Sequence, residues 1–154
     1  MDYFPNLSEE DDERIASALR AQADVESSPL IRVVAIGRAS EAADVRVELI
    51  ALEVRAIGAI LFWKAYPSVD RMLGDPIISV DDEFRTDYQI ISVGGGGTGR
   101  VWRGEAHIIP SPSLTTRRFS VEVRAFEGFG DGIPGLAPSG MSQGPWRFEF
   151  AIGP

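Results

Sequence analysis

The stretch RFSVEVRA, residues 118–125, decides the fold, because apolar and polar side chains alternate strictly along it. A period of two is typical of a β-strand with one face packed and the other face in water. Residues 102–108 and 146–152 repeat the pattern. Three such strands indicate antiparallel sheets that pack together through their apolar faces.

The first half of the chain adds strands with other patterns. Residues 30–38 form a β-rich run, and along 45–55 the apolar positions change parity after Leu49. Such a change indicates a β-bulge or a strand that crosses between sheets. Residues 59–66 are apolar on both parities, which predicts a central strand. Together with 84–92 this makes about seven strands without a long helical pattern between them, which favours a mainly β, immunoglobulin-like antiparallel β-sandwich over a βαβ fold.

The N-terminal residues differ from the rest in charge. Residues 1–28 hold eight acidic side chains and two arginines, so we expect an acidic N-terminal arm ahead of a β-sandwich domain over 29–154. The sequence Ser8-Glu9-Glu10-Asp11 is a capping-box pattern, and it predicts a short helix over about 9–23. The helix should dock lightly on the domain or on a partner, because its apolar stripe is thin and comprises Ile15, Ala18, Leu19 and Ala23.

The composition excludes several classes of protein and site. The chain has 154 residues, a net charge of −8 and no cysteine, so disulfides, thiolate metal sites and a cysteine nucleophile are excluded. An acidic chain without a basic stripe argues against binding to nucleic acid or to anionic membrane surfaces. No apolar run approaches the roughly 18 residues of a membrane-spanning helix. Since no signal-peptide pattern is present either, we expect a cytoplasmic protein. No cofactor-binding motif is found, so we also expect no cofactor.

The glycine run 94–99 matches the spacing of two phosphate-binding patterns. Both patterns require a helix directly after the loop, because the N-terminal N–H groups of that helix bind the anion. Here a strand follows, so we expect a flexible connection between strands and no nucleotide site. His107 is the sole histidine, and alternation places it on the wet face of 102–108, where we expect it to be solvated. One histidine supplies neither a catalytic triad nor a multi-histidine metal site.

The densest acidic cluster outside the arm lies before a predicted strand and comprises Asp81, Asp82, Glu83 and Asp87. It lacks the central glycine and terminal glutamate of an EF-hand loop. A solvated turn is the expected structure. Whether Asp81, Asp82 and Asp87 hold a cation stays open.

The connection 127–145 is the segment with the strongest functional pattern. Connections longer than about 12–15 residues without regular structure are usually functional or disordered. This one carries four bulky apolar side chains, which a polar linker would lack, and we expect them to bind a partner: Phe129, Ile133, Leu136 and Met141. The alternative is that they pack against the edge of their own sandwich.

The second half of the chain resembles uncharacterised bacterial immunoglobulin-like domains of actinobacterial type. The resemblance spans about residues 45–152 and rests on these pieces: Asp81-Asp82 followed by Thr86 and Tyr88, the glycine run, Trp102-x-Gly104, Pro110 and Pro112, Arg117-Arg118-Phe119, and Trp146-x-Phe148-x-Phe150. It implies a β-sandwich without an assigned activity, and it transfers no catalytic or ligand-binding residue. Arg85 departs from the pattern, because a glycine is more usual at this position.

Three functions from different classes follow from these patterns. The first is a non-enzymatic interaction or assembly module that binds a protein partner or a second copy of the chain. The second is a structural subunit of a larger particle, such as a phage or shell component. The third is a small-ligand-binding or metal-dependent hydrolase that uses the acidic cluster, although the sequence offers no nucleophile paired with a base.

Overall fold

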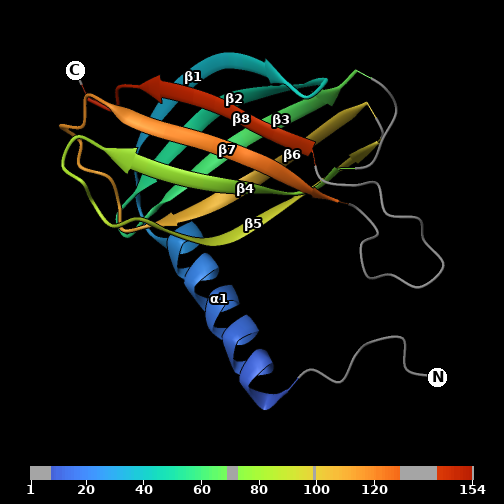
Figure 1. Ribbon diagram of the computed structural model, residues 1–154. Helices are drawn as coiled ribbons and strands as arrows, with labels where there is room; N and C mark the ends of the chain where they lie inside the picture. Colours follow the sequence, from blue (N-terminus) through green and yellow to red (C-terminus); the bar gives the residue numbers. More distant parts are fainter. Residues whose placement is uncertain (1–7, 69–72, 99, 129–141, 154) are drawn as a thin grey trace.

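The computed structural model describes residues 8–68, 73–98, 100–128 and 142–153 of the chain (Figure 1). In these residues one helix precedes eight strands. Their bounds are α1 (Glu9–Ser27), β1 (Leu30–Ala42), β2 (Val45–Arg55), β3 (Ala59–Pro67), β4 (Leu73–Asp82), β5 (Gln89–Thr98), β6 (Val101–Ile109), β7 (Phe119–Gly128) and β8 (Ser142–Phe150). No helix in the described ranges is long and apolar enough to cross a membrane.

The strands form two antiparallel sheets, as expected for a mainly β, sandwich-like fold. Sheet A has five strands in the order β1-β2-β3-β6-β5, and sheet B has three in the order β4-β7-β8. In immunoglobulin constant domains the first, second, fifth and fourth strands share a sheet. Here the first three strands share a sheet with the fifth and sixth, so the immunoglobulin topology is not confirmed.

The clearest differences from the prediction are at β4 and β5. No strand was predicted at β4, because Gly74 and Pro76 interrupt its alternation. The strand predicted over 84–92 begins only at Gln89, since the residues before it form the turn that joins β4 to β5. Eight strands therefore stand where about seven were expected.

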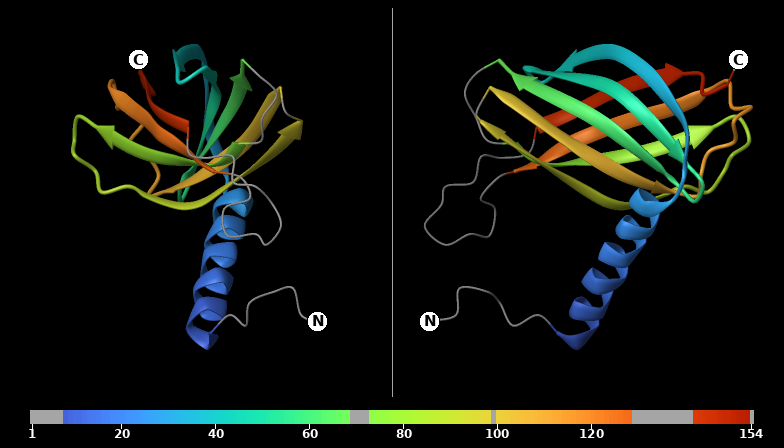
Figure 2. Two further views of the ribbon diagram at one scale, coloured as in Figure 1. Left: turned by 45° about the vertical axis from the view of Figure 1, so that its right-hand side comes forward. Right: turned by 180° about the vertical axis from the view of Figure 1, so that it is seen from behind.

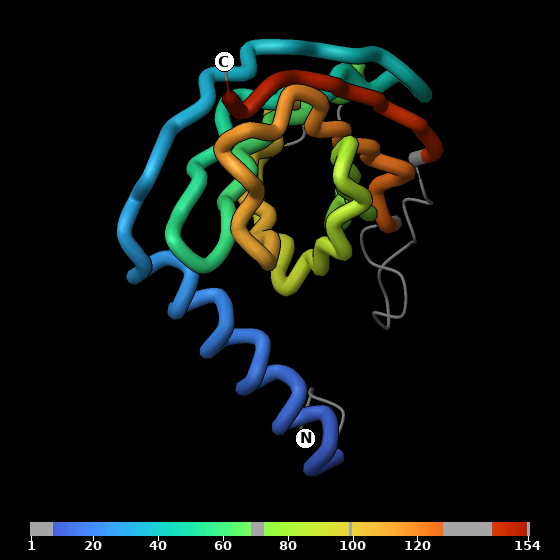
Figure 3. Tube along the Cα trace, turned by 90° about the vertical axis from the view of Figure 1, so that its left-hand side faces the viewer, coloured from blue at the N-terminus to red at the C-terminus, as the bar shows by residue number. Residues whose placement is uncertain are grey.

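The two sheets curve around a common interior, which Figure 3 shows nearly end-on. On one side β1 lies beside β8: the Arg32 guanidinium donates to the Ile152 carbonyl at 3.0 Å, and Arg38 donates to the Glu149 carbonyl. On the other side β4 lies against β5. Apolar side chains of both sheets fill the interior, as the alternation predicted.

The parity change in 45–55 is confirmed as a bulge in β2. Val47 and Leu49 are buried before it and Leu52 and Val54 after it. The pairing of β2 with β3 shifts register between Leu49 and Ala51, so the extra residue rotates the strand by one position. Both halves of β2 therefore present apolar side chains to the same core. The prediction that 59–66 is a central strand is also confirmed, because β3 lies in the middle of sheet A.

Trp146 connects the two sheets through the core. Its side chain on β8 is fully buried, and its Nε1–H donates to the Val45 carbonyl of sheet A at 2.9 Å. The Phe126 ring of β7 packs edge-on against Trp146 at 5.3 Å and against Trp63 of β3 at 5.8 Å between ring centroids. Aromatic packing and one buried hydrogen bond therefore fix how sheet B sits on sheet A.

The prediction of a flexible glycine connection is wrong for the described residues of the run. Gly94, Gly95 and Gly96 belong to β5 and pair with β6, where Gly95 lies opposite Gly104. The physical reason is the Trp63 ring, which lies against both of these glycines. A Cβ at Gly104 would lie 2.5 Å from Trp63 Cζ2 and 2.1 Å from the Gly94 carbonyl oxygen. The role of glycine here is to leave space for a core tryptophan, not to make the chain flexible.

The helix begins where the sequence predicts and ends later. Asp11 N–H donates to Ser8 Oγ at 3.1 Å, which confirms Ser8 as the N-cap. The helix continues to Ser27, beyond the predicted end, because its last turn packs on sheet A and buries Val25 completely. The rest of α1 extends away from the sheets (Figures 1 and 2). The division into an arm and a domain near residue 28 falls between α1 and β1 and stays a prediction.

Candidate functional site

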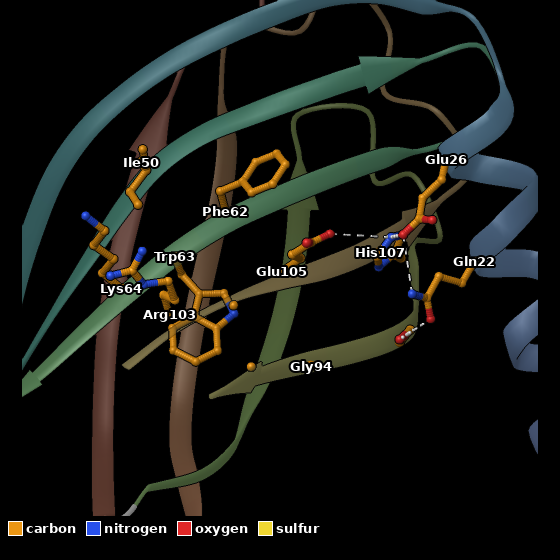
Figure 4. A pocket seen from close by; sticks show the side chains of 13 residues that line it. Gln22, Glu26, Ile50, Phe62, Trp63, Lys64, Gly94, Arg103, Glu105 and His107 are labelled. Carbon is orange, nitrogen blue, oxygen red and sulfur yellow. Dashed lines mark hydrogen bonds and ion pairs between the residues drawn. The ribbon is translucent and has the colours of Figure 1, made fainter. Parts of the chain in front are cut away.

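A hollow of about 490 Å³ lies on the outer face of sheet A, beside the C-terminal half of α1 (Figure 4). The neighbouring strands β3, β6 and β5 form its floor, and α1 closes one end. Gly94 of β5 keeps it open, because a Cβ at this position would meet nothing within 4 Å. Polar side chains occupy its two ends, Phe62 lies between them, and Ile50 lies near Lys64.

A chain of polar contacts joins α1 to sheet A at one end of the hollow. Ser92 Oγ of β5 donates to Gln22 Oε1 at 2.9 Å, and Gln22 Nε2 donates to Glu26 Oε1 at 3.4 Å. Glu26 Oε1 lies 2.8 Å from His107 Nε2 of β6. Glu105 Oε2, two residues earlier on the same face of β6, lies 3.9 Å from the same nitrogen. Figure 4 shows these side chains converging.

The prediction that His107 is solvated is wrong. Its side chain is only 3% exposed, because the last turn of α1 covers this part of the face. A carboxylate only accepts hydrogen bonds, so Nε2 carries the proton and donates to Glu26. The other ring nitrogen, Nδ1, is buried without a hydrogen-bond partner among the described residues. Alternation identified the face of the strand correctly, but no sequence signal showed that a helix 81 positions away covers it.

Two cations face each other at the other end of the hollow. Lys64 of β3 lies directly across from Arg103 of β6. Like charges at directly opposed positions destabilise a sheet by a few tenths of a kcal/mol. Neither side chain forms an ion pair with another described residue, although Glu48 of β2 lies directly across from Lys64 on its other side.

The acidic cluster predicted near residue 82 forms a structural turn. Asp82 is buried, and its two carboxylate oxygens accept four hydrogen bonds from the turn that follows: from the N–H groups of Phe84 and Thr86, the Thr86 hydroxyl at 2.7 Å and the Tyr88 hydroxyl at 2.6 Å. Arg85 has a φ of 55°, a left-handed conformation that favours glycine.

These hydrogen bonds leave the Asp82 carboxylate without a free lone pair for a cation. Asp81 Oδ1 accepts from the Asp82 N–H at 2.9 Å. In the described part of the chain, three or more potential metal ligands come together only at Glu26, Glu105 and His107. This geometry therefore gives no support to a cation site formed by Asp81, Asp82 and Asp87.

Asp82→Asn should lower the free energy of unfolding by about 2 kcal/mol at neutral pH. Burial acts to raise the pKa of Asp82, but the hydrogen bonds from Tyr88, Thr86 and Phe84 outweigh it and hold this pKa below its ordinary value. A depressed pKa in the folded state stabilises the protein above the ordinary carboxyl pKa of about 4, and this stabilisation is lost as the pH falls below it. Urea unfolding at several pH values should show the difference between the two proteins shrinking below about pH 4. The exposed Asp75→Asn is the control, and an equal loss there would contradict the assignment.

The four residues predicted to bind a partner, Phe129, Ile133, Leu136 and Met141, lie outside the described residues. Their role stays a prediction.

An apolar surface missed by that prediction lies on α1. Ile15, Leu19, Gln22 and Glu26 follow one another at helical spacing and therefore share one side of the helix. Gln22 and Glu26 bond to sheet A, whereas Ile15 and Leu19 are 46% and 60% exposed. The sequence had indicated the stripe, but only the structure shows which half of it is covered.

The chain matches no protein-family model and no curated protein. Among solved structures it is similar to the crystal structure of the conserved domain protein from Bacillus anthracis, with a TM-score of 0.54 and 15% sequence identity. The match covers 77% of this chain and 47% of that chain, so this chain spans about half the length of the protein it matches. A likeness at this identity supports the fold, a β-rich two-sheet domain, and carries no function.

Proposed function

We propose that this chain is a non-enzymatic interaction module that presents α1 to a protein partner. The observation that carries the proposal is the continuous side of α1 whose C-terminal half is docked and whose N-terminal half is bare. Gln22 and Glu26 bond to sheet A, while Leu19 and Ile15 extend the same side beyond the sheet. The docked turn fixes the direction of the helix, so the exposed half is held in place for a partner.

The charge of α1 favours a partner with a basic surface. The helix carries seven acidic residues and two arginines, and four of the acids stand in its first turn. An amphipathic helix commonly binds by laying its apolar side into a groove of its partner. A groove lined by apolar side chains and edged by lysine or arginine would match both the stripe and the acids around it. Nucleic acid and anionic membranes repel the same helix.

The two alternatives from the sequence are less well supported. A particle subunit requires contacts between copies of the chain, but two α1 helices packed through Ile15 and Leu19 would bring two acidic surfaces together. A hydrolase built on the acidic cluster would need free carboxylate oxygens, whereas those of Asp82 are engaged by the turn. We therefore favour binding to a different protein.

Leu19→Asp should separate binding from folding. Because the Leu19 side chain is 60% exposed, the free energy of unfolding should change by no more than about 0.5 kcal/mol. The partner recovered on the immobilised protein from native-host extract should fall at least tenfold, and recovery by the native protein should weaken with added salt. Ser17→Asp adds the same charge on the opposite side of α1 and should recover the partner normally. Equal recovery by the two variants would overturn the proposal.

A further inference from the structure

Three potential metal ligands meet where α1 docks on sheet A. Glu26 of α1 and Glu105 and His107 of β6 each offer one donor atom, and these three atoms lie within 4.8 Å of one another. Glu105 and His107 are two positions apart on one strand face, so the strand itself aims both side chains outward. The helix supplies the third ligand from above.

The distances fit one small divalent ion after modest side-chain movement. Donors that bind one tetrahedral ion at 2.0–2.1 Å lie about 3.3 Å apart. The distances from His107 Nε2 are 2.8 Å to Glu26 Oε1 and 3.9 Å to Glu105 Oε2, one below this value and one above it. His107 is fixed by burial, whereas the side chains of Glu26 and Glu105 are 47% and 48% exposed and free to adjust. The hollow beside them leaves room for water to complete the coordination.

The negative charges of the cluster also favour a bound cation. The donor atoms of two carboxylates lie within 4.8 Å of one another and of the imidazole nitrogen, and no described lysine or arginine side chain pairs with either carboxylate. One carboxylate is already oriented, because Gln22 donates to Glu26 and is itself held by Ser92. Supporting contacts of this kind are typical around metal ligands.

We infer that Glu26, Glu105 and His107 bind a divalent first-row transition ion, of which Zn²⁺ is the probe of choice. An imidazole ligand favours such ions, whereas Mg²⁺ and Ca²⁺ favour sites made of oxygen alone. The ion joins α1 to β6 and thereby stabilises the docked turn of the helix. This inference does not rest on the proposed protein partner.

The sole histidine of the chain makes a direct test available. Nitrogen NMR of the ¹⁵N-labelled, metal-stripped full-length protein should show the His107 proton on Nε2, where it is donated to Glu26. One equivalent of Zn²⁺ should displace it, because Nε2 then binds the ion, and the ring proton should move to Nδ1. Mg²⁺ at the same concentration should leave both ring nitrogens unchanged.

Variants connect this signal to the three ligands. Glu105→Gln and Glu26→Gln should each weaken Zn²⁺ binding at least tenfold, as measured by titration of the His107 nitrogen signals. Glu48→Gln, which removes a carboxylate elsewhere on sheet A, should bind Zn²⁺ like the native protein. Amide spectra without metal establish that each variant is folded. Ring nitrogens that stay unchanged at millimolar Zn²⁺, or a Glu105→Gln variant that binds like the native protein, would overturn the inference.

Discussion

Trp146→Ala should lower the free energy of unfolding by about 4 kcal/mol, a large part of the total stability of a small domain. The Trp146 side chain is fully buried between the sheets, so its removal leaves a cavity that neither sheet closes. It also removes the donor to the Val45 carbonyl, which is then buried without its partner. Urea unfolding followed by circular dichroism measures the loss.

Two further variants separate the contribution of the buried hydrogen bond from that of apolar packing and provide a control. Trp146→Phe keeps most of the apolar contact and removes the hydrogen bond, so its loss should be about half as large. Leu114→Ala, at a side chain that is 36% exposed, should cost less than about 1 kcal/mol. If Trp146→Ala loses no more than Leu114→Ala, Trp146 does not hold the sheets together.

Gly104→Ala should lower the free energy of unfolding by about 3 kcal/mol. The added Cβ would lie 2.1 Å from the Gly94 carbonyl oxygen and 2.5 Å from Trp63 Cζ2, so backbone and ring must both move. Because β5 and β6 form the floor of the hollow, the change should also disturb the hollow itself. Thermal and urea unfolding measure the effect.

The glycine run supplies a matched control on the neighbouring strand. A Cβ at Gly96 meets nothing within 4 Å, so Gly96→Ala should leave the stability unchanged or raise it slightly, since alanine restricts the unfolded chain. The two substitutions add the same methyl group to paired strands. Similar stabilities for the two variants would contradict the role assigned to Gly104.

Alternation predicted much of the architecture because it reports which side chains share a strand face. It identified the buried side of β7 and the parity change after Leu49, which the structure shows to be a bulge rather than a crossing between sheets. The central place of β3 was predicted from apolar residues on both faces and is confirmed. Alternation says nothing about which strands are neighbours, so the order of the two sheets differs from the immunoglobulin expectation. A run of glycines has no side-chain period at all, so the sequence predicts a connection where the glycine end of β5 lies.

The candidate sites were harder to predict, because they depend on contacts between distant segments. His107 lies on the predicted face of β6, but its burial depends on where α1 docks. That docking involves the polar residues Gln22 and Glu26, which a search for apolar stripes passes over. The sequence did predict the thin apolar stripe of α1. Only the structure shows that the turn around Val25 is buried while Ile15 and Leu19 of the stripe are exposed.

The most direct test of the interaction module is site-specific photo-crosslinking in cells of the native host. A photoreactive phenylalanine analogue at Leu19 should form an adduct with one different protein that carries a basic surface, and high salt before irradiation should reduce it. The same analogue at Ser17, on the opposite side of α1, should form none. Absence of an adduct at Leu19, equal adducts at both positions, or adducts only between copies of this chain would contradict the proposal.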